Sequence, residues 1–252
     1  MKTFIEIARV AAHSAGEVLL DLYGNTIEEY KNESFDVGSI VTEADRLSEN
    51  CIKTIIQIAF PEHSFYGEEG GAETKDSPYL WVVDPLDGTS NFSHNIPLFG
   101  ISIALLKDGQ PILGILYFPK LGLFVEAEEG KGATANGKKI SVSQKPIEKS
   151  LYYAGGRFRG ETYMQRIPSI MSICGLVKII DASSFELAQI AMGDAELYVL
   201  GNVLHDVAAG VCIVREAGGK VTDRFGNPWT PESEGIVVSN GVIHEQVIEL
   251  LK

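Results

Sequence analysis

The chain has 252 residues, 45% of them hydrophobic, which suits one large globular domain or two smaller ones. Its 21 basic and 34 acidic side chains give a formal net charge of −13, which argues against sequence-independent nucleic-acid binding and against an anionic membrane surface. Three widely spaced cysteines argue against a disulfide framework or a zinc cluster. Because no stretch approaches the ~18 apolar residues of a membrane-spanning helix and no signal peptide is evident, we expect a cytoplasmic protein.

The N-terminal part predicts two helices separated by a polar segment. Apolar residues recur at helical spacing over 3–23, and the Gly-Asn pair that follows provides a stop. Residues 28–40 are polar and predict a mobile loop or a short hairpin. A second apolar face predicts a helix over 43–59, with Asp45 in its first turn.

An apolar run over 79–83 predicts a short buried strand that ends at an Asp-Pro pair. Asp84 and Asp87 then share a tight turn, which the proline between them stiffens. Gly88 lets an anion approach the backbone, and residues 89–91 would cap a turn of helix whose N–H groups suit a phosphate. Hard oxygen ligands for a cation, next to hydrogen-bond donors for an anion, indicate metal-assisted phosphate chemistry. The alternative is a surface turn with two solvated aspartates.

The rest of the chain alternates strands and helices. Strands are expected at 100–106, 112–118, 123–127, 151–154, 177–180, 196–200, 220–222 and 235–238, a glycine-rich turn at 131–137, and helices at 161–174, 184–192, 206–217 and 241–251. This mixture favours a layered α+β fold. With a boundary near 144–146, we expect an N-terminal α+β half, 1–145, and a C-terminal α/β half, 146–252, in one compact catalytic unit.

Four stretches together resemble the inositol monophosphatase family, within the wider group that includes fructose-1,6-bisphosphatases and 3'-nucleotidases. They are Val-Thr-Glu-Ala-Asp at 41–45, Gly-Glu-Glu-Gly-Gly at 67–71, Asp-Pro-Leu-Asp-Gly-Thr-Ser-Asn-Phe at 84–92 and Leu-His-Asp-Val-Ala-Ala-Gly at 204–210. The resemblance runs from about residue 3 to 250. It implies a five-layer αβαβα sandwich, a Mg²⁺-dependent phosphatase with two to three ions, and a homodimer.

The resemblance also implies the metal ligands. Glu68, Asp84 and the main-chain carbonyl of Leu86 match a first metal site, and a third, weaker ion would touch Glu68. Asp84, Asp87 and Asp206 match a second site, with Asp84 bridging the two. Gathered carboxylates would repel one another without cations, and paired cations can activate a water and stabilise a leaving alkoxide. Asp206 could instead be only the N-cap of a helix that begins at 207.

The implied catalytic residues are Asp45, Thr89 and Glu68. Asp45 and Thr89 match the pair that orients the attacking water, while the backbone N–H groups of Gly88 and Thr89 would hold phosphate oxygens. A threonine hydroxyl is a weak base alone, but a nearby carboxylate and a metal-lowered water pKa make proton removal feasible. Asp45 could instead be only a first-turn partner of the helix dipole.

The expected substrate pocket uses Asp87, Gly88, Thr89, Ser183, Arg157 and Asp206. This chain departs from the family around it: His205 stands where tryptophan is frequent, and Asp-Ala-Ser-Ser at 181–184 replaces Gly-Ser-Ala-Ala. Val199 stands where some inositol-specific members carry a glutamate that contacts hydroxyls, which predicts weaker selectivity for inositol. Arg157 and Arg159 would either reach a second phosphate or lie exposed on a loop.

These features predict a phosphomonoesterase that hydrolyses inositol-1-phosphate or a related small sugar or polyol phosphate by attack of a metal-activated water. The alternatives are a fructose-1,6-bisphosphatase or a broad-specificity phosphatase for nucleotides or NADP. A hypothesis of another class is a non-catalytic regulator that binds metal and ligand. The intact set of Asp45, Glu68, Asp84, Asp87, Thr89 and Asp206 speaks against it.

Overall fold

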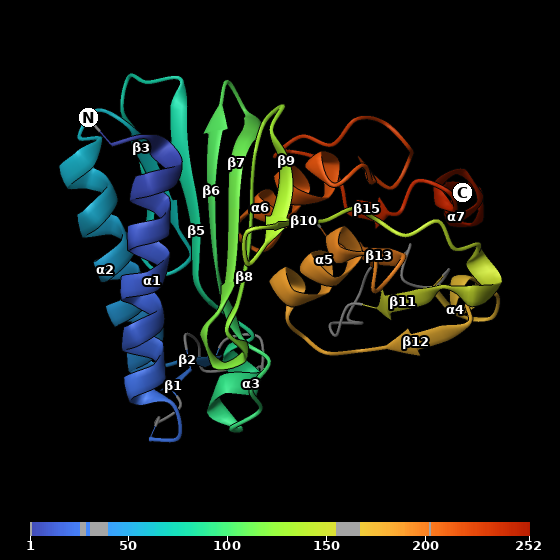
Figure 1. Ribbon diagram of the computed structural model, residues 1–252, viewed down its shortest axis with the longest axis horizontal. Coiled ribbons are helices and arrows are strands. Elements are labelled where there is room, and N and C mark those ends of the chain that lie inside the picture. Colours follow the sequence, from blue (N-terminus) through green and yellow to red (C-terminus); the bar gives the residue numbers. More distant parts are fainter. Residues whose placement is uncertain (1, 26–28, 31–39, 155–166, 202) are drawn as a thin grey trace.

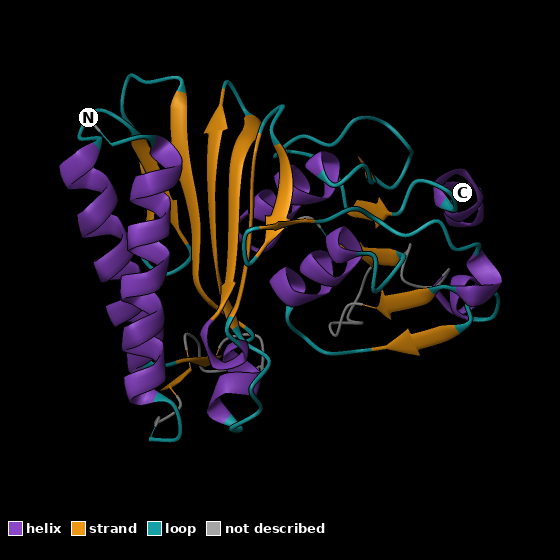
Figure 2. Cartoon of the chain, in the orientation of Figure 1, coloured by secondary structure: helices purple, strands orange, loops and turns teal. Residues whose placement is uncertain are grey.

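The computed structural model describes residues 2–25, 29–30, 40–154, 167–201 and 203–252. Within them, helices and sheets alternate in five layers (Figures 1 and 2). The layers are α1 (Phe4–Leu22) with α2 (Glu43–Ala59), an eight-stranded sheet, α5 (Ser183–Met192) with α6 (Leu204–Glu216), a five-stranded sheet, and α4 (Ile167–Met171) with α7 (His244–Leu251). The expected αβαβα sandwich is confirmed.

The large sheet has the strand order β10-β9-β8-β7-β6-β5-β3-β4 and is antiparallel except where β3 and β5 run parallel. Its strands are β3 (Ser64–Gly67), β4 (Gly71–Glu73), β5 (Tyr79–Asp87), β6 (Gly100–Lys107), β7 (Gln110–Phe118), β8 (Leu123–Glu128), β9 (Gly132–Ala135) and β10 (Lys138–Lys139). The parallel pair matters for the site, because it brings the ends of β3 and β5 to the same edge.

The small sheet has the order β12-β11-β13-β15-β14. Its strands are β11 (Leu151–Ala154), β12 (Leu176–Lys178), β13 (Leu197–Leu200), β14 (Lys220–Thr222) and β15 (Ile236–Ser239). The remaining elements are β1 (Glu29–Tyr30), which pairs with β2 (Ile40–Val41), the short helix α3 (Thr89–Ser93), and the 3-10 turns Pro119–Leu121 and Ile147–Lys149. The β1–β2 pair agrees with the short-hairpin alternative, although residues 31–39 lie outside the described part.

Both faces of the large sheet are covered, which explains why its strands read as unbroken apolar runs. On β5, Trp81 and Val83 pack in the cluster with α1 and α2, whereas Val82 packs in the cluster with α5 and α6. A Cβ on Gly114 of β7 would lie 2.4 Å from the carbonyl oxygen of Ala209 on α6. Helix α6 therefore rests directly on the sheet at its second turn.

The apolar core extends across the boundary expected near residues 144–146. One cluster joins Val82 and Leu116 from the first half to Leu187 and Val207 from the second. The division at 145 stays a prediction. No helix among the described residues is long and apolar enough to cross a lipid bilayer.

Several expected element bounds were wrong. Strand β5 continues through the proline to Asp87, because a register shift between Asp84 and Asp87 accommodates the residue without an N–H. The expected turn over 131–137 contains strand β9, and β3 and β4 were not expected as strands. Helix α4 ends at Met171, and the expected helical residues 161–166 lie outside the described part.

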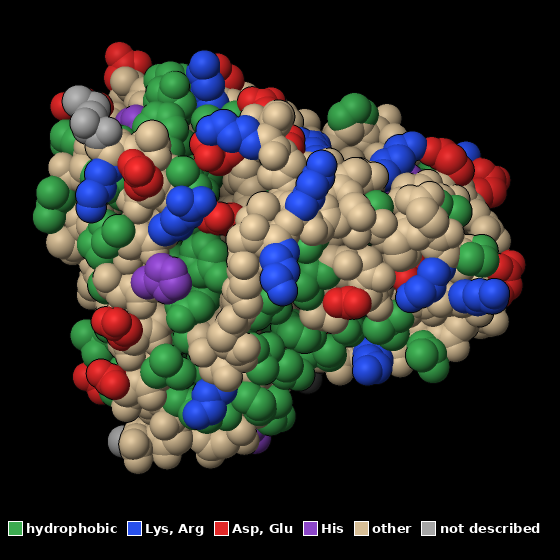
Figure 3. Space-filling view, in the orientation of Figure 1, with side chains coloured by type: hydrophobic (Ala, Val, Ile, Leu, Met, Phe, Trp, Pro, Cys, Tyr) green, Lys and Arg blue, Asp and Glu red, His purple; other side chains and the backbone are tan. Residues whose placement is uncertain are grey.

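Surface charge is mixed on the face drawn in Figure 3, where acidic and basic side chains are interspersed. The net charge of −13 is therefore not gathered into one acidic block on that face. A separate, local group of carboxylates lies between the sheet and helix α6.

Candidate metal centre

Strands β3 and β5 end, and helix α6 begins, near the same place, and together they bring acidic groups close to one another. Glu68 follows β3 and donates its N–H to the carbonyl oxygen of Val83 at 3.1 Å, which sets it beside Asp84 on β5. From the opposite side, the first turn of α6 carries His205, whose carbonyl oxygen accepts a hydrogen bond from the Ser102 hydroxyl at 3.2 Å. The sheet edge and the start of α6 therefore face each other across a small acidic space.

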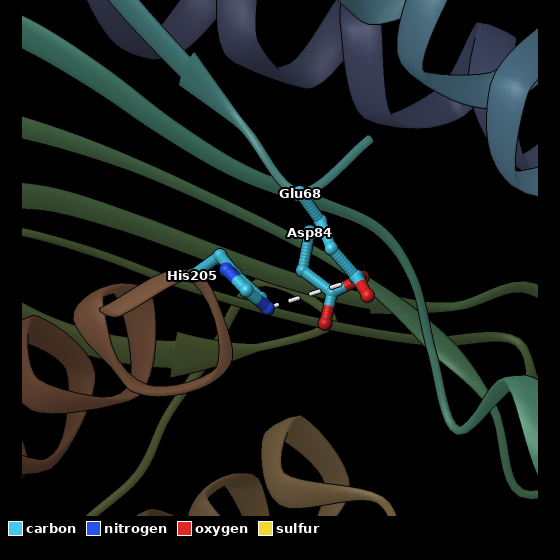
Figure 4. Close-up of side chains that lie close together, drawn as sticks. All are labelled: Glu68, Asp84 and His205. Carbon is cyan, nitrogen blue, oxygen red and sulfur yellow. Dashed lines mark ion pairs between the residues drawn. The ribbon is translucent and has the colours of Figure 1, made fainter. Parts of the chain in front are cut away.

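One ligand atom from each of Glu68, Asp84 and His205 lies within 4.8 Å of the other two, a group that could hold a metal ion. Figure 4 shows the three side chains pointing toward one another from the turn after β3, from β5 and from α6. Nε2 of His205 lies 4.0 Å from a carboxylate oxygen of Glu68 and 3.1 Å from Oδ1 of Asp206. Asp84 is buried, whereas Glu68, His205 and Asp206 are half-buried.

The electrostatics show that the expected carboxylates converge. Burial raises the pKa of Asp84 well above its usual value, and the charges of Glu68, Asp87 and Asp206 raise it further. Burial also raises the pKa of Asp87 to about 7, with Asp206 adding to the effect. A divalent cation would relieve this repulsion, and carboxylate oxygens are the ligands that Mg²⁺ prefers. The donor set therefore fits the cation that the resemblance implies.

Asp87 links the sheet to α5. Its carboxylate accepts the N–H groups of Ser183 at 3.2 Å and Ser184 at 2.8 Å, together with the Ser184 hydroxyl. It thus caps a helix whose own N-cap residue, Ala182, makes no side-chain hydrogen bond. The Ser183 hydroxyl accepts a hydrogen bond from Tyr198 at 2.9 Å, so both of its polar groups are engaged within the protein.

Asp45 and Thr89, far apart in the sequence, lie in hydrogen-bond contact. The Thr89 hydroxyl is 3.1 Å from Oδ1 of Asp45 and 2.9 Å from the carbonyl oxygen of Leu86, and its single proton can go to one of them at a time. The other oxygen of Asp45 accepts the N–H and the hydroxyl of Thr42, the N-cap of α2, at 2.7 and 2.6 Å. Burial raises the pKa of Asp45 to about 6, against these hydrogen bonds.

Gly88 adopts a left-handed conformation, φ 81°, that favours glycine, and a Cβ there would lie 2.8 Å from the carbonyl oxygen of Leu98. It is the N-cap of α3, a place that the sequence suggested for residues 89–91. Thr89 is the first residue of α3 and so is not its cap; its hydroxyl instead lies within hydrogen-bond distance of Asp45 and the carbonyl oxygen of Leu86. Whether the N–H groups of Gly88 and Thr89 bind phosphate stays a prediction.

Leu86 lies on β5 between Asp84 and Asp87, and Asp206 lies in the first turn of α6. The N–H of Leu86 donates to Oδ1 of Asp84 at 3.0 Å, and its carbonyl oxygen faces the Thr89 hydroxyl. Asp206 is not an N-cap, as its alternative interpretation required: α6 begins at Leu204 after the cap residue Val203 and contains Asp206 in its first turn. Its charge nevertheless acts on both Asp84 and Asp87.

Of the three positions expected to govern substrate choice, two lie outside the described residues and one is buried. Arg157 and Arg159 fall in 155–166, outside the described part. Val199 on β13 is fully buried in an apolar cluster with Ala154, Val237 and Val247 of α7. It therefore offers no hydrogen bond to a hydroxyl.

Sequence reasoning missed residues that hold the backbone of the site segments in place through hydrogen bonds. Glu49 on α2 accepts the N–H groups of Glu69 and Gly70, each at 2.8 Å, and so holds the turn that carries Glu68. Ser48 donates its hydroxyl to the carbonyl oxygen of Pro85 at 2.8 Å. His205 was noted as a departure but not as a member of the cluster; its position beside Asp206 was the available signal.

Comparison with known proteins agrees with this geometry. A model described as the inositol monophosphatase family matches residues 1–252. The chain belongs to the inositol monophosphatase family. It is therefore a phosphatase that hydrolyses phosphate monoesters, in a family that depends on metal ions, generally Mg²⁺.

Relatives carry several names. The chain is 33% identical over 239 residues to a fructose-1,6-bisphosphatase/inositol-1-monophosphatase of Thermotoga maritima, covering 94% of this chain and 91% of that protein. It is 34% identical over 258 residues to an inositol-1-monophosphatase of Synechocystis, covering 100% and 89%. It is also 34% identical over 251 residues to the Nus factor SuhB of Pseudomonas aeruginosa, covering 95% and 92%.

Solved structures of the family share the fold. The extragenic suppressor protein suhB of Bartonella henselae superposes with a TM-score of 0.91 at 31% identity, covering 98% of each chain. A Thermotoga maritima IMPase superposes with a TM-score of 0.88 at 31% identity, covering 98% of this chain and 96% of the other.

Proposed function

We propose that this family member is a Mg²⁺-dependent phosphatase acting on inositol-1-phosphate or a related small sugar or polyol phosphate. The observation that carries the proposal is the convergence of Glu68, Asp84, Asp87 and Asp206, where burial and then the three neighbouring charges raise the pKa of Asp84. These residues, with the carbonyl of Leu86, would hold two to three ions. Bound Mg²⁺ supplies a water of lowered pKa and neutralises charge on the phosphate and the leaving oxygen.

Asp45 and Thr89 would position and deprotonate the attacking water, next to the metal-binding residue Glu68. While the Thr89 hydroxyl donates to Asp45, its free lone pair can accept a hydrogen bond from water. A proton taken from the water by Thr89 is balanced by transfer of the threonine proton to Oδ1 of Asp45. The raised pKa of Asp45, about 6, suits it to receive a proton near neutral pH. The N–H groups of Gly88 and Thr89 would hold the phosphate oxygens.

A monophosphate with several hydroxyls is the proposed substrate class. Relatives of similar identity are named for inositol-1-monophosphatase or for both it and fructose-1,6-bisphosphatase. With Val199 buried among apolar side chains, we expect weak discrimination between polyols. The bisphosphate and nucleotide alternatives depend on Arg157 and Arg159.

A non-catalytic regulator is the competing hypothesis from another class, and a relative named as a Nus factor keeps it relevant. The hydrogen bond between Thr89 and Asp45 favours catalysis, because a site used only for ligand binding has no need of this proton route. We also propose a homodimer in the cytoplasm; light scattering after gel filtration should give twice the mass of 27.4 kDa.

Phosphate release from a panel of substrates tests the proposal. The panel is inositol-1-phosphate, fructose-1,6-bisphosphate, a 3'-phosphonucleotide and NADP, each with Mg²⁺ and with a chelator. We expect Mg²⁺-dependent release, fastest with the small polyol monophosphate. Release that persists with the chelator, or no release from any substrate, would contradict the proposal.

A further inference from the structure

The imidazole of His205 is the one nitrogen donor in the three-residue group that could hold a metal ion, as far as the described residues extend. Two contacts position His205, one through its main chain and one through its ring. The His205 carbonyl oxygen accepts the Ser102 hydroxyl at 3.2 Å, and the ring lies 6.1 Å, centroid to centroid, from that of Tyr66 on β3. The ring is thus directed into the acidic space from the start of α6 (Figure 4).

The separations suit shared coordination of one ion. Ligands that surround an ion at about 2.1 Å lie roughly 3 to 4 Å from one another. Nε2 of His205 is 4.0 Å from the carboxylate oxygen of Glu68, and the whole group falls within 4.8 Å. A small inward movement of these side chains would therefore complete a site with one nitrogen and two carboxylate ligands.

We propose that His205 is a nitrogen ligand at the cation position shared by Glu68 and Asp84, and that it makes this position bind Co²⁺ or Zn²⁺ more tightly than Mg²⁺. Imidazole binds these first-row ions well, whereas Mg²⁺ prefers oxygen and water. Coordination by Nε2 uses the neutral tautomer with its proton on Nδ1. The inference rests on the proposed function for the existence of a cation position, and adds which ions this chain's version selects.

The competing role for His205 is a hydrogen bond to Asp206 alone, 3.1 Å away. In that role the imidazole would orient a ligand without touching the ion. The two roles differ in whether a nitrogen is bonded to the metal, and metal affinity and spectroscopy can both report this.

The test combines calorimetric titration with paramagnetic proton NMR on the full chain. The variants are His205→Phe, which keeps a ring beside Tyr66, and the control His13→Phe on α1, whose imidazole stacks on Phe124. We expect the parent and the control to bind Co²⁺ at least about tenfold more tightly than Mg²⁺ and to show a Co²⁺-shifted imidazole N–H signal. His205→Phe should lose that signal and at least about tenfold in Co²⁺ affinity, with Mg²⁺ affinity changed by less than about threefold.

The proposal is overturned if Co²⁺ binds the parent without a shifted imidazole signal, or if His205→Phe binds Co²⁺ as tightly as the parent. The parent spectrum decides the matter even if the variant fails to fold. Mg²⁺-dependent phosphate release by the parent reports separately on the proposed function, so the two can fail independently.

Discussion

The large sheet and the helices that face it contribute to the site in different ways. The sheet edge supplies Asp84 and Asp87 on β5 and Glu68 just after β3, so the negative charge is fixed to rigid backbone. From the other side, α6 adds His205 and Asp206 in its first turn, while the start of α5 donates N–H groups to Asp87. The sheet concentrates charge, and the two helix N-termini face it with their positive dipole ends.

If the sheet carries the cations, removing its central carboxylate should have the largest effect. We expect Asp84→Asn to lower kcat/KM by about 10⁴-fold, because transition-state charge loses several kcal/mol of stabilisation. The same variant should lose the rise in Tm that Mg²⁺ gives the parent. Phosphate release and calorimetry with and without Mg²⁺ check both; a variant that keeps the Mg²⁺-dependent rise would show that Asp84 is no ligand.

The pair between α2 and α3 should matter for rate but not for cation binding. Asp45→Asn removes the proton acceptor of Thr89, and we expect kcat to fall by about 10²- to 10³-fold. The rise of Tm with Mg²⁺ should persist, in contrast to Asp84→Asn. Loss of the Mg²⁺ effect in Asp45→Asn would instead mean that this carboxylate acts on the cations.

On the helix side, a smaller change is expected from Ser184→Ala, which removes the hydroxyl bond to Asp87 but leaves the backbone N–H bond of 2.8 Å. We expect kcat to fall by about tenfold and stability to fall by about 1–2 kcal/mol. Ser150→Ala is the matched control, a buried serine that bonds to Ile147 at 2.6 Å away from the cluster. It should lose stability while keeping kcat; an equal loss of kcat in both would deny Ser184 a specific role.

The smallest effect expected is on the stability of the metal-free protein as pH changes. The folded protein raises the pKa of Asp87 to about 7, above its unfolded value, so this group's contribution is lost as pH rises from about 4 to about 7. Burial lowers the pKa of His244 to about 4, which acts in the opposite sense, so parent and variant must be compared. In chelator, Asp87→Asn should exceed the parent in Tm by several degrees more at pH 7.5 than at pH 4.5.

This prediction is contradicted if the Tm difference between Asp87→Asn and the parent is the same at pH 4.5 and pH 7.5. Adding Mg²⁺ should reverse the order at pH 7.5, because the parent then gains stability that the variant cannot.

The sequence predicted a layered fold from its mixture of strands and helices, and the acidic residues of the site from contiguous motifs that resemble those of the family. It could not derive their convergence from periodicity, since that depends on the parallel pairing of β3 with β5 and on the packing of α6 against β7. The end of β5 was placed too early: a proline normally ends a central strand, and only a register shift lets this one continue.

Supporting residues were harder to predict than ligands. Glu49 accepts hydrogen bonds from backbone groups about 20 residues away, and Ser184 donates two to the distant carboxylate of Asp87. Neither residue belongs to a recognisable pattern of spacing. Asp206 was predicted as a site residue, but its alternative as a helix cap was wrong, because α6 begins one turn earlier with an apolar cap residue. Local residue preference does not record such tertiary choices.

Anomalous diffraction from crystals soaked in Mn²⁺, as a substitute for Mg²⁺, tests the central claim most directly. We predict density peaks about 2 to 2.3 Å from carboxylate oxygens of Asp84, with at least one ion shared by Asp206 across the interface between sheet and helix. Peaks only at surface carboxylates, or an ion bound to Asp84 with Asp206 turned away from it, would contradict the claim that both sides of the molecule form one cation site.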